Sequence, residues 1–194
     1  FLHLRCEVSA PDCLEGFELF RNDSRVKLAS LMDHSPGQRQ FTSIETYKVY
    51  YMNKTGMTEE DFRQFCDKRI TQSQTYSSRH RNAIAEICRD NGIILASHDD
   101  ATMEHVDEAA TQGVRVAEFP TTQEAARASR EAGMQVLMGA PNVVRGGSHS
   151  GNVSARSLAE GKTLDILSSD YIPFSLVQAA FALGETVEHI SLPQ

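Results

Sequence analysis

The fold class is decided by residues 93–139, which read IILASHDDATMEHVDEAATQGVRVAEFPTTQEAARASREAGMQVLMG. Three short apolar runs in this stretch, Ile93–Ser97, Val114–Phe119 and Gln135–Gly139, alternate with two helical patterns that each stop at a glycine. Such runs are typical of strands buried on both faces of a parallel sheet, and a glycine commonly ends a helix. The stretch therefore predicts the repeated strand–helix unit of a barrel or a doubly wound sheet.

Apolar runs of similar length occur on both sides of this stretch. They are Leu2–Cys6, Val26–Met32 and Leu164–Ser168, which brings the expected number of strands to six. A further helical pattern lies at Ser154–Glu160 and ends at Gly161. We therefore predict an α/β fold with about six parallel strands, forming a single domain over residues 1–194.

The segment at about 36–91 breaks the alternation of strands and helices. It is polar and rich in Tyr, Lys and Arg, and its best helical patterns are Thr58–Ile70 and Arg79–Asp90. A connection of this length inside a compact domain is usually a functional insertion over an active site. We therefore predict a helical insertion here.

Composition and charge exclude several classes of partner. The formal net charge of −7 argues against non-specific binding to nucleic acid or to an anionic membrane. No apolar run is long enough to cross a bilayer. The four cysteines form no C-x-x-C pair, as expected of thiols in a reducing compartment. We expect a cytoplasmic protein without a nucleic-acid or membrane partner.

Acidic and imidazole side chains occur where the apolar runs finish. Glu7, His34, His98 and Asp170 each follow or end such a run. The carboxyl ends of the strands form the active-site face of a parallel barrel, and imidazole together with carboxylate suits Zn, with Mn or Fe as alternatives. The pattern predicts a divalent metal site, although a single strand-end His can be a hydrogen-bonding group, Asp170 a helix N-cap and Glu7 a solvated loop residue.

Two polar loops are candidates for binding phosphate. One is Arg145-Gly-Gly-Ser-His-Ser-Gly-Asn152, which lies between a strand and a helix, where backbone N–H groups can form an anion cradle. The other is the loop at residues 36–40, which follows His34 and contains Arg39. A flexible surface loop or a solvated arginine remains the alternative for each. The predicted phosphate-binding set is Arg39, Arg145, Gly146, Gly147, Ser148 and His149.

Seven motifs along nearly the whole chain carry a resemblance to a known family. They are HLRCE (3–7), LMDHSPGQRQF (31–41), ASHDD (96–100), AEFPTT (117–122), MGAPN (138–142), RGGSHSGN (145–152) and LSSDY (167–171). In this order they resemble the PhnM family, the triphosphate diphosphatases of the bacterial carbon–phosphorus lyase pathway, which belong to the amidohydrolase superfamily.

The resemblance implies a (β/α)8 TIM barrel of the metal-dependent hydrolase type, of which this chain would be a part. It implies hydrolysis of a phosphorylated small molecule, α-D-ribose 1-methylphosphonate 5-triphosphate, to the 5-phosphate and pyrophosphate. By order along the chain, Glu7 matches the bridging ligand of the superfamily, and His34 and His98 match its two histidine ligands. Asp170 matches the final aspartate, which is both a metal ligand and the catalytic acid/base.

The sequence departs from the superfamily pattern in two respects. It contains no His-x-His motif, so we expect that the early strands of the barrel are missing and that the chain alone is inactive. Counting strands back from Asp170 places the other ligands one strand early, so His3 is a possible ligand in place of Glu7. The open strand edges of such a piece predict self-association, and we expect a homo-oligomer.

Two other functions stay open at this point. One is a C–N hydrolase of the same superfamily, such as a cyclic amidase or a nucleobase deaminase. The other is a non-catalytic folding or interaction unit. A preference for triphosphate over amide substrates separates the first from a diphosphatase, and tight stoichiometric metal binding argues against the second.

Overall fold

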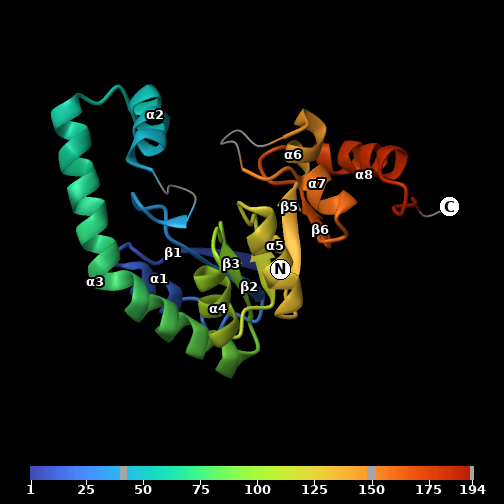
Figure 1. The fold of residues 1–194 in the computed structure, drawn as a ribbon. Helices are drawn as coiled ribbons and strands as arrows, with labels where there is room; N and C mark the ends of the chain where they lie inside the picture. Colours follow the sequence, from blue (N-terminus) through green and yellow to red (C-terminus); the bar gives the residue numbers. More distant parts are fainter. Residues whose placement is uncertain (40–42, 148–151, 193–194) are drawn as a thin grey trace. The chain divides into compact units, whose positions relative to one another are not determined.

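The computed structural model describes residues 1–39, 43–147 and 152–192 (Figure 1). The chain divides into two compact units, Phe1–His98 and Asp99–Gln194. Each unit contains three strands, so six strands lie within the described residues. In each unit the order of the strands along the sheet is their order along the chain.

The sheet of the first unit consists of β1 (Leu2–Glu7), β2 (Val26–Met32) and β3 (Ile94–His98). The central strand β2 pairs in parallel with both neighbours, with Glu7 opposite Met32 and Leu31 opposite Ser97. Because the strands are parallel and in register, their carboxyl ends lie at one edge of this sheet. Ala29, Leu31 and Ala96 in the strand interiors are completely buried, which explains their unbroken apolar runs.

The helices of the first unit are α1 (Cys13–Glu18), α2 (Ile44–Thr55) and α3 (Glu59–Asn91). The two separate helical patterns predicted within 58–90 form one helix of 33 residues, drawn in green in Figure 1. No Gly or Pro interrupts it. The side chain of Thr58 caps its start by accepting from the N–H of Asp61, and Gly92 ends it with a φ of 65°.

The sheet of the second unit consists of β4 (Val116–Glu118), β5 (Gln135–Gly139) and β6 (Ile166–Ser168), with β5 paired in parallel to both neighbours. Its helices are α4 (Met103–Thr111), α5 (Gln123–Glu131), α6 (Ala140–Arg145), α7 (Ala155–Glu160) and α8 (Ser175–Thr186).

Local sequence accounts for the ends of α4 and α5. The side chains of Thr102 and Thr122 cap their first turns, and Gly113 and Gly133, with φ of 80° and 83°, follow their last turns. Both glycines were predicted as helix stops. The alternation of strand and helix in this unit therefore follows from these caps and stops.

The predicted α/β class and the six parallel strands are confirmed, and the arrangement is consistent with a partial (β/α)8 barrel. The prediction that residues 1–194 form one domain stays a prediction. In the part of the chain that the structure describes, no helix combines the length and apolar character needed to span a membrane.

Candidate metal centre

Three of the predicted metal ligands lie at the carboxyl edge of the first sheet. Glu7 is the last residue of β1, His98 is the last residue of β3, and His34 is the second residue after β2. The register of the three strands places Glu7 and His98 on either side of the end of β2. The structure therefore brings these three residues together, as the strand-end argument predicts.

Glu7 and His34 form a pair of hydrogen bonds. The Nδ1 atom of His34 lies 2.6 Å from Oε2 of Glu7, and the backbone N–H of His34 donates to Oε1 at 3.0 Å. Since the carboxylate can only accept, Nδ1 carries a proton, and in the neutral form of the ring the lone pair is then on Nε2. A histidine that binds a metal usually donates its other ring N–H to a carboxylate in this way.

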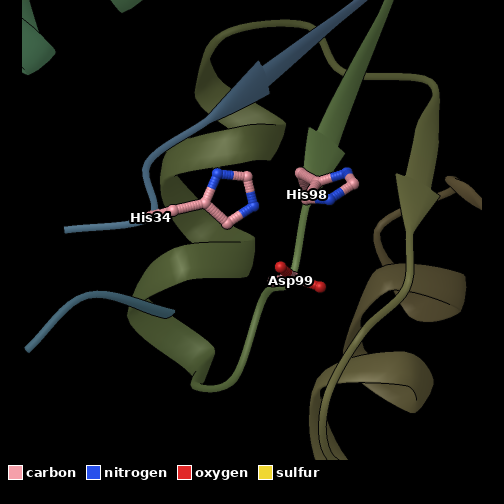
Figure 2. Close-up of side chains that lie close together, drawn as sticks. All are labelled: His34, His98 and Asp99. Atoms are coloured by element: carbon pink, nitrogen blue, oxygen red, sulfur yellow. The ribbon is translucent and has the colours of Figure 1, made fainter. Parts of the chain in front are cut away.

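The ring of His34 points toward His98, and the carboxylate of Asp99 lies beside both (Figure 2). The two rings meet edge to face, with their centroids 5.6 Å apart. One ligand atom each from His34, His98 and Asp99 lies within 4.8 Å of the others. Ligand atoms about 2.1 Å from one tetrahedral zinc ion are about 3.4 Å apart, so the three side chains would move together by about 1 Å to hold an ion.

Asp99 joins the group because of its backbone conformation. Consecutive side chains of a strand point to opposite faces, so an extended chain would direct His98 and Asp99 apart. Asp99 instead has a φ of 56°, in the left-handed region that Asp adopts more readily than most residues. Its side chain is buried, with 6% of its surface exposed.

The carboxylate of Glu7 is surrounded by hydrogen-bond donors that stabilise its negative charge. Burial alone raises the pKa of Glu7, but hydrogen bonds from the ring and backbone of His34 and from Ser9 lower that pKa to about 2. An N–H of Arg69 also donates to Oε1 of Glu7 at 3.2 Å. Glu7 is therefore ionised, and its carboxylate can orient His34 as the outer partner of a metal ligand. A second arginine, Arg5, approaches Nε2 of His98 at 3.5 Å.

The donor set fits a divalent metal ion. Two imidazoles and a buried carboxylate are ligands that zinc, manganese and iron accept, and Glu7 supplies the outer carboxylate that such a site needs. Glu7 itself lies on the Nδ1 side of His34, outside the group of three. His3 is four residues earlier, about 13 Å along β1 at 3.3 Å per residue, and its Nε2 bonds Ser30.

Asp170 lies in the second unit, two residues after β6, and its side chain is exposed. It has a φ of 49°. Its carboxylate lies against the end of β5, where a Cβ added to Gly139 would be 3.2 Å from its Oδ2. Glycine at position 139 therefore provides the space in which the Asp170 side chain sits.

The predicted phosphate-binding residues differ in their surroundings. Arg145 is exposed at the end of α6 and donates to the hydroxyl of Tyr171 at 2.9 Å. The N–H groups of Gly146 and Gly147 both donate to the carbonyl of Asn142, where they close the end of α6. Arg39 is buried, with a φ of 40°. Ser148 and His149 lie outside the described residues.

The prediction from sequence included Glu7, His34 and His98 but missed Asp99 and Arg69. Asp99 stands in the polar triplet 98–100, which begins at the last residue of β3, so its position was visible, but its direction depends on the backbone turn. Arg69 is 62 residues from Glu7 along the chain. No local pattern joins residues at that separation.

The chain is similar to a curated protein of Escherichia coli (strain K12) named alpha-D-ribose 1-methylphosphonate 5-triphosphate diphosphatase. The two are 52% identical over 194 residues, which are 100% of this chain and 51% of that protein. The chain thus spans about half the length of the curated relative it matches. No family model and no solved structure matches the chain. The resemblance predicted from the seven motifs is confirmed.

Proposed function

We propose that this chain, all of which aligns with part of that diphosphatase, is one part of a metal-dependent hydrolase. The intact hydrolase would convert α-D-ribose 1-methylphosphonate 5-triphosphate to the 5-phosphate and pyrophosphate. The observation that carries the proposal is the 52% identity over all 194 residues. The cluster of His34, His98 and Asp99 supports its metal dependence.

The residues at and just after the ends of β2 and β3 would supply the metal site. A divalent ion, zinc first and manganese or iron as alternatives, would lower the pKa of a water and neutralise charge on a phosphoryl oxygen. His34, His98 and Asp99 would hold that ion, and Glu7 would orient His34 through Nδ1. Glu7 matches a metal ligand in the family, but its oxygens in this structure already accept from His34, Ser9 and Arg69.

In the proposed reaction a water oxygen attacks the α-phosphorus, and the bond from that phosphorus to the bridging oxygen breaks. Pyrophosphate leaves with the bonding electrons. We assign Asp170 the role of accepting the proton of the attacking water, as the family resemblance implies. Arg145 and Arg39 would neutralise charge on the substrate oxygens.

The first expected result concerns Gly139. Replacing it with alanine places a Cβ 3.2 Å from Oδ2 of Asp170, so the carboxylate must move by a few tenths of an ångström. A displacement of about 1 Å in a reacting group can cost about 100-fold, and we expect kcat to fall by up to that factor. Gly16→Ala is the matched control, because a Cβ there meets nothing within 4 Å. A kcat of Gly139→Ala equal to that of the control contradicts the role of Asp170.

Arg145→Ala is expected to lower kcat/KM for the triphosphate by at least about tenfold, because a charge-assisted hydrogen bond to a phosphate oxygen is lost. Arg127→Ala is the control, since Arg127 is an exposed arginine of α5 that pairs with Glu131. Steady-state kinetics of the intact enzyme measures both. Equal values for the two variants would reduce Arg145 to a surface residue that bonds Tyr171.

The proposed function is tested against its rivals by a substrate panel. The intact protein is loaded with zinc, manganese or iron, and its kcat/KM is measured for the ribose triphosphate, a cyclic amide and a nucleobase. We expect the triphosphate to be the preferred substrate. A preference for either C–N substrate identifies a C–N hydrolase, and no tight metal binding together with no turnover identifies a folding or interaction unit.

Two further expectations belong to this proposal. The four cysteines are free thiols, which supports a reducing compartment and hence the cytoplasm. The expected partner is the phosphorylated small molecule. Homo-oligomerisation stays a prediction, to be measured as the mass of the intact protein in solution.

A further inference from the structure

One face of helix α3 carries a row of polar side chains, three of them buried and the first, Arg69, partly buried. Arg69, Ser73, Ser77 and His80 follow one another at intervals of four, four and three residues, which places them on one side of the helix. Ser73 and Ser77 are 9% exposed and His80 is 2% exposed. A buried helix face is normally apolar, and buried polar groups need hydrogen-bond partners. The partners of this row all lie just at or beyond the ends of β1 and β2.

The two serines bind Asp33, the residue before His34. The hydroxyls of Ser73 and Ser77 each donate to Oδ2 of Asp33 at 2.7 Å. The other oxygen, Oδ1, accepts the backbone N–H of Ser35 at 3.0 Å. The Asp33 carboxylate, in a residue that is 4% exposed, therefore spans His34 and fixes the backbone on both sides of it.

The other two side chains of the row act on the end of β1. Arg69 donates to Oε1 of Glu7 at 3.2 Å, and Glu7 binds the ring of His34 at 2.6 Å. His80 donates from Nδ1 to the carbonyl of Val8, the residue after Glu7, at 3.0 Å. The backbone of His34 is thus held through Asp33 and its ring through Glu7, and both carboxylates are bound to the same face of α3.

We propose that Ser73 and Ser77 are positioning residues that set the direction of the His34 imidazole through Asp33. The proposal rests on the proposed function, because His34 is one of the residues that would hold the metal. A buried carboxylate that loses its donors is strongly destabilised, so removing both hydroxyls forces Asp33 to move or to admit water. The backbone at His34 then loses its anchor. Loss of a direct outer partner of a metal ligand typically weakens metal binding by about 10-fold to 100-fold. Ser73 and Ser77 act one step further out, through Asp33.

The test uses the double variant Ser73→Ala/Ser77→Ala in the intact protein. Ser78→Ala is the matched control, because Ser78 is an exposed serine of the same helix. Ser73→Thr/Ser77→Thr keeps both hydroxyls and serves as the rescue. Two quantities are measured: the affinity for Co²⁺, from its visible absorption spectrum, and the ¹⁵N signals of the His34 ring in the metal-free protein.

We expect the double variant to bind Co²⁺ about tenfold more weakly, at the lower end of that range, with an altered absorption spectrum. In the metal-free protein, movement of the backbone at His34 should lengthen the 2.6 Å hydrogen bond between its Nδ1 and Glu7, so the ¹⁵N signals of the ring should shift. Ser78→Ala and the threonine variant should match the wild type. If the double variant does not fold, the single variants Ser73→Ala and Ser77→Ala, each of which keeps one donor to Asp33, are measured in the same way.

Unchanged ¹⁵N signals of His34 in the folded alanine variants overturn the proposal, because the imidazole is then held without the serines. This readout needs no metal. If the wild type binds no Co²⁺, the proposed function fails, whereas the ring signals of the metal-free variants still decide whether the serines position His34.

Discussion

His98→Ala is expected to lower kcat/KM for the ribose triphosphate by roughly 10³-fold and to strip the metal from the protein. His98 is 5% exposed at the end of β3, and its ring faces that of His34 at 5.6 Å between centroids. The metal is expected to contribute several kcal/mol to the transition state, and each 1.36 kcal/mol is tenfold in rate. Alanine leaves one imidazole beside Asp99, which is too few ligands for a stable site.

The measurement for His98 combines steady-state kinetics with the metal content of the purified protein. His189→Ala is the control, because it removes an exposed imidazole near the end of the described chain. The control should keep both its metal and its rate. A His98→Ala protein that retains a full equivalent of metal and its activity would show that this histidine holds no metal.

Asp170→Asn is expected to lower kcat by about 10²-fold to 10⁴-fold, the usual contribution of a general base. Asparagine has nearly the same shape as aspartate, so it fits the space beside Gly139 that the carboxylate occupies. It cannot accept the proton of the attacking water, because an amide is far less basic than a carboxylate. We therefore expect a large loss in kcat and a smaller change in metal content.

The control for Asp170 is Asp107→Asn, an exposed aspartate of α4. Both variants are compared with the wild type over a range of substrate concentrations, which separates kcat from KM. A kcat of Asp170→Asn within about twofold of the wild type would assign the proton transfer to another group.

The strands could be predicted closely because their apolar runs are short and sharply bounded. The observed β2 and β5 have the predicted ends. β4 ends one residue before its run, because Phe119 turns away with a φ of 53°, and begins two residues after the start of the run, where the N–H of Val114 still donates to the carbonyl of Ala109 in α4. The prediction that the run at 164–168 is a strand holds only for Ile166–Ser168.

Helix α3 could not be predicted as one helix from hydrophobic periodicity. Its middle, residues 71–78, is polar, so the apolar repeat is interrupted and two helices were predicted in place of one. The interruption has a structural reason: Ser73 and Ser77 face the carboxylate of Asp33. The partner is 40 residues or more away along the chain, so nothing local reveals it.

The candidate site likewise contains residues that could be predicted from the sequence and residues that could not. His34 and His98 could be predicted because imidazoles that end buried strands of one sheet meet at its edge. Asp99 could not, because its direction depends on a φ of 56°. The anion cradle at Gly146 and Gly147 was argued from the glycines, the polar side chains and the place of the loop before a helix. In the structure the N–H groups of both glycines close the unpredicted helix α6.

The central claim is that the histidines at these strand ends serve a metal-dependent diphosphatase. The most direct test follows the ³¹P NMR spectrum of the ribose triphosphate with the intact protein, first after removal of metal by a chelator and then after addition of zinc, manganese or iron. We predict no reaction without metal, and equal amounts of the 5-phosphate and pyrophosphate once metal is restored. Full activity in the chelated protein, or no pyrophosphate with any of the three metals, would contradict the claim.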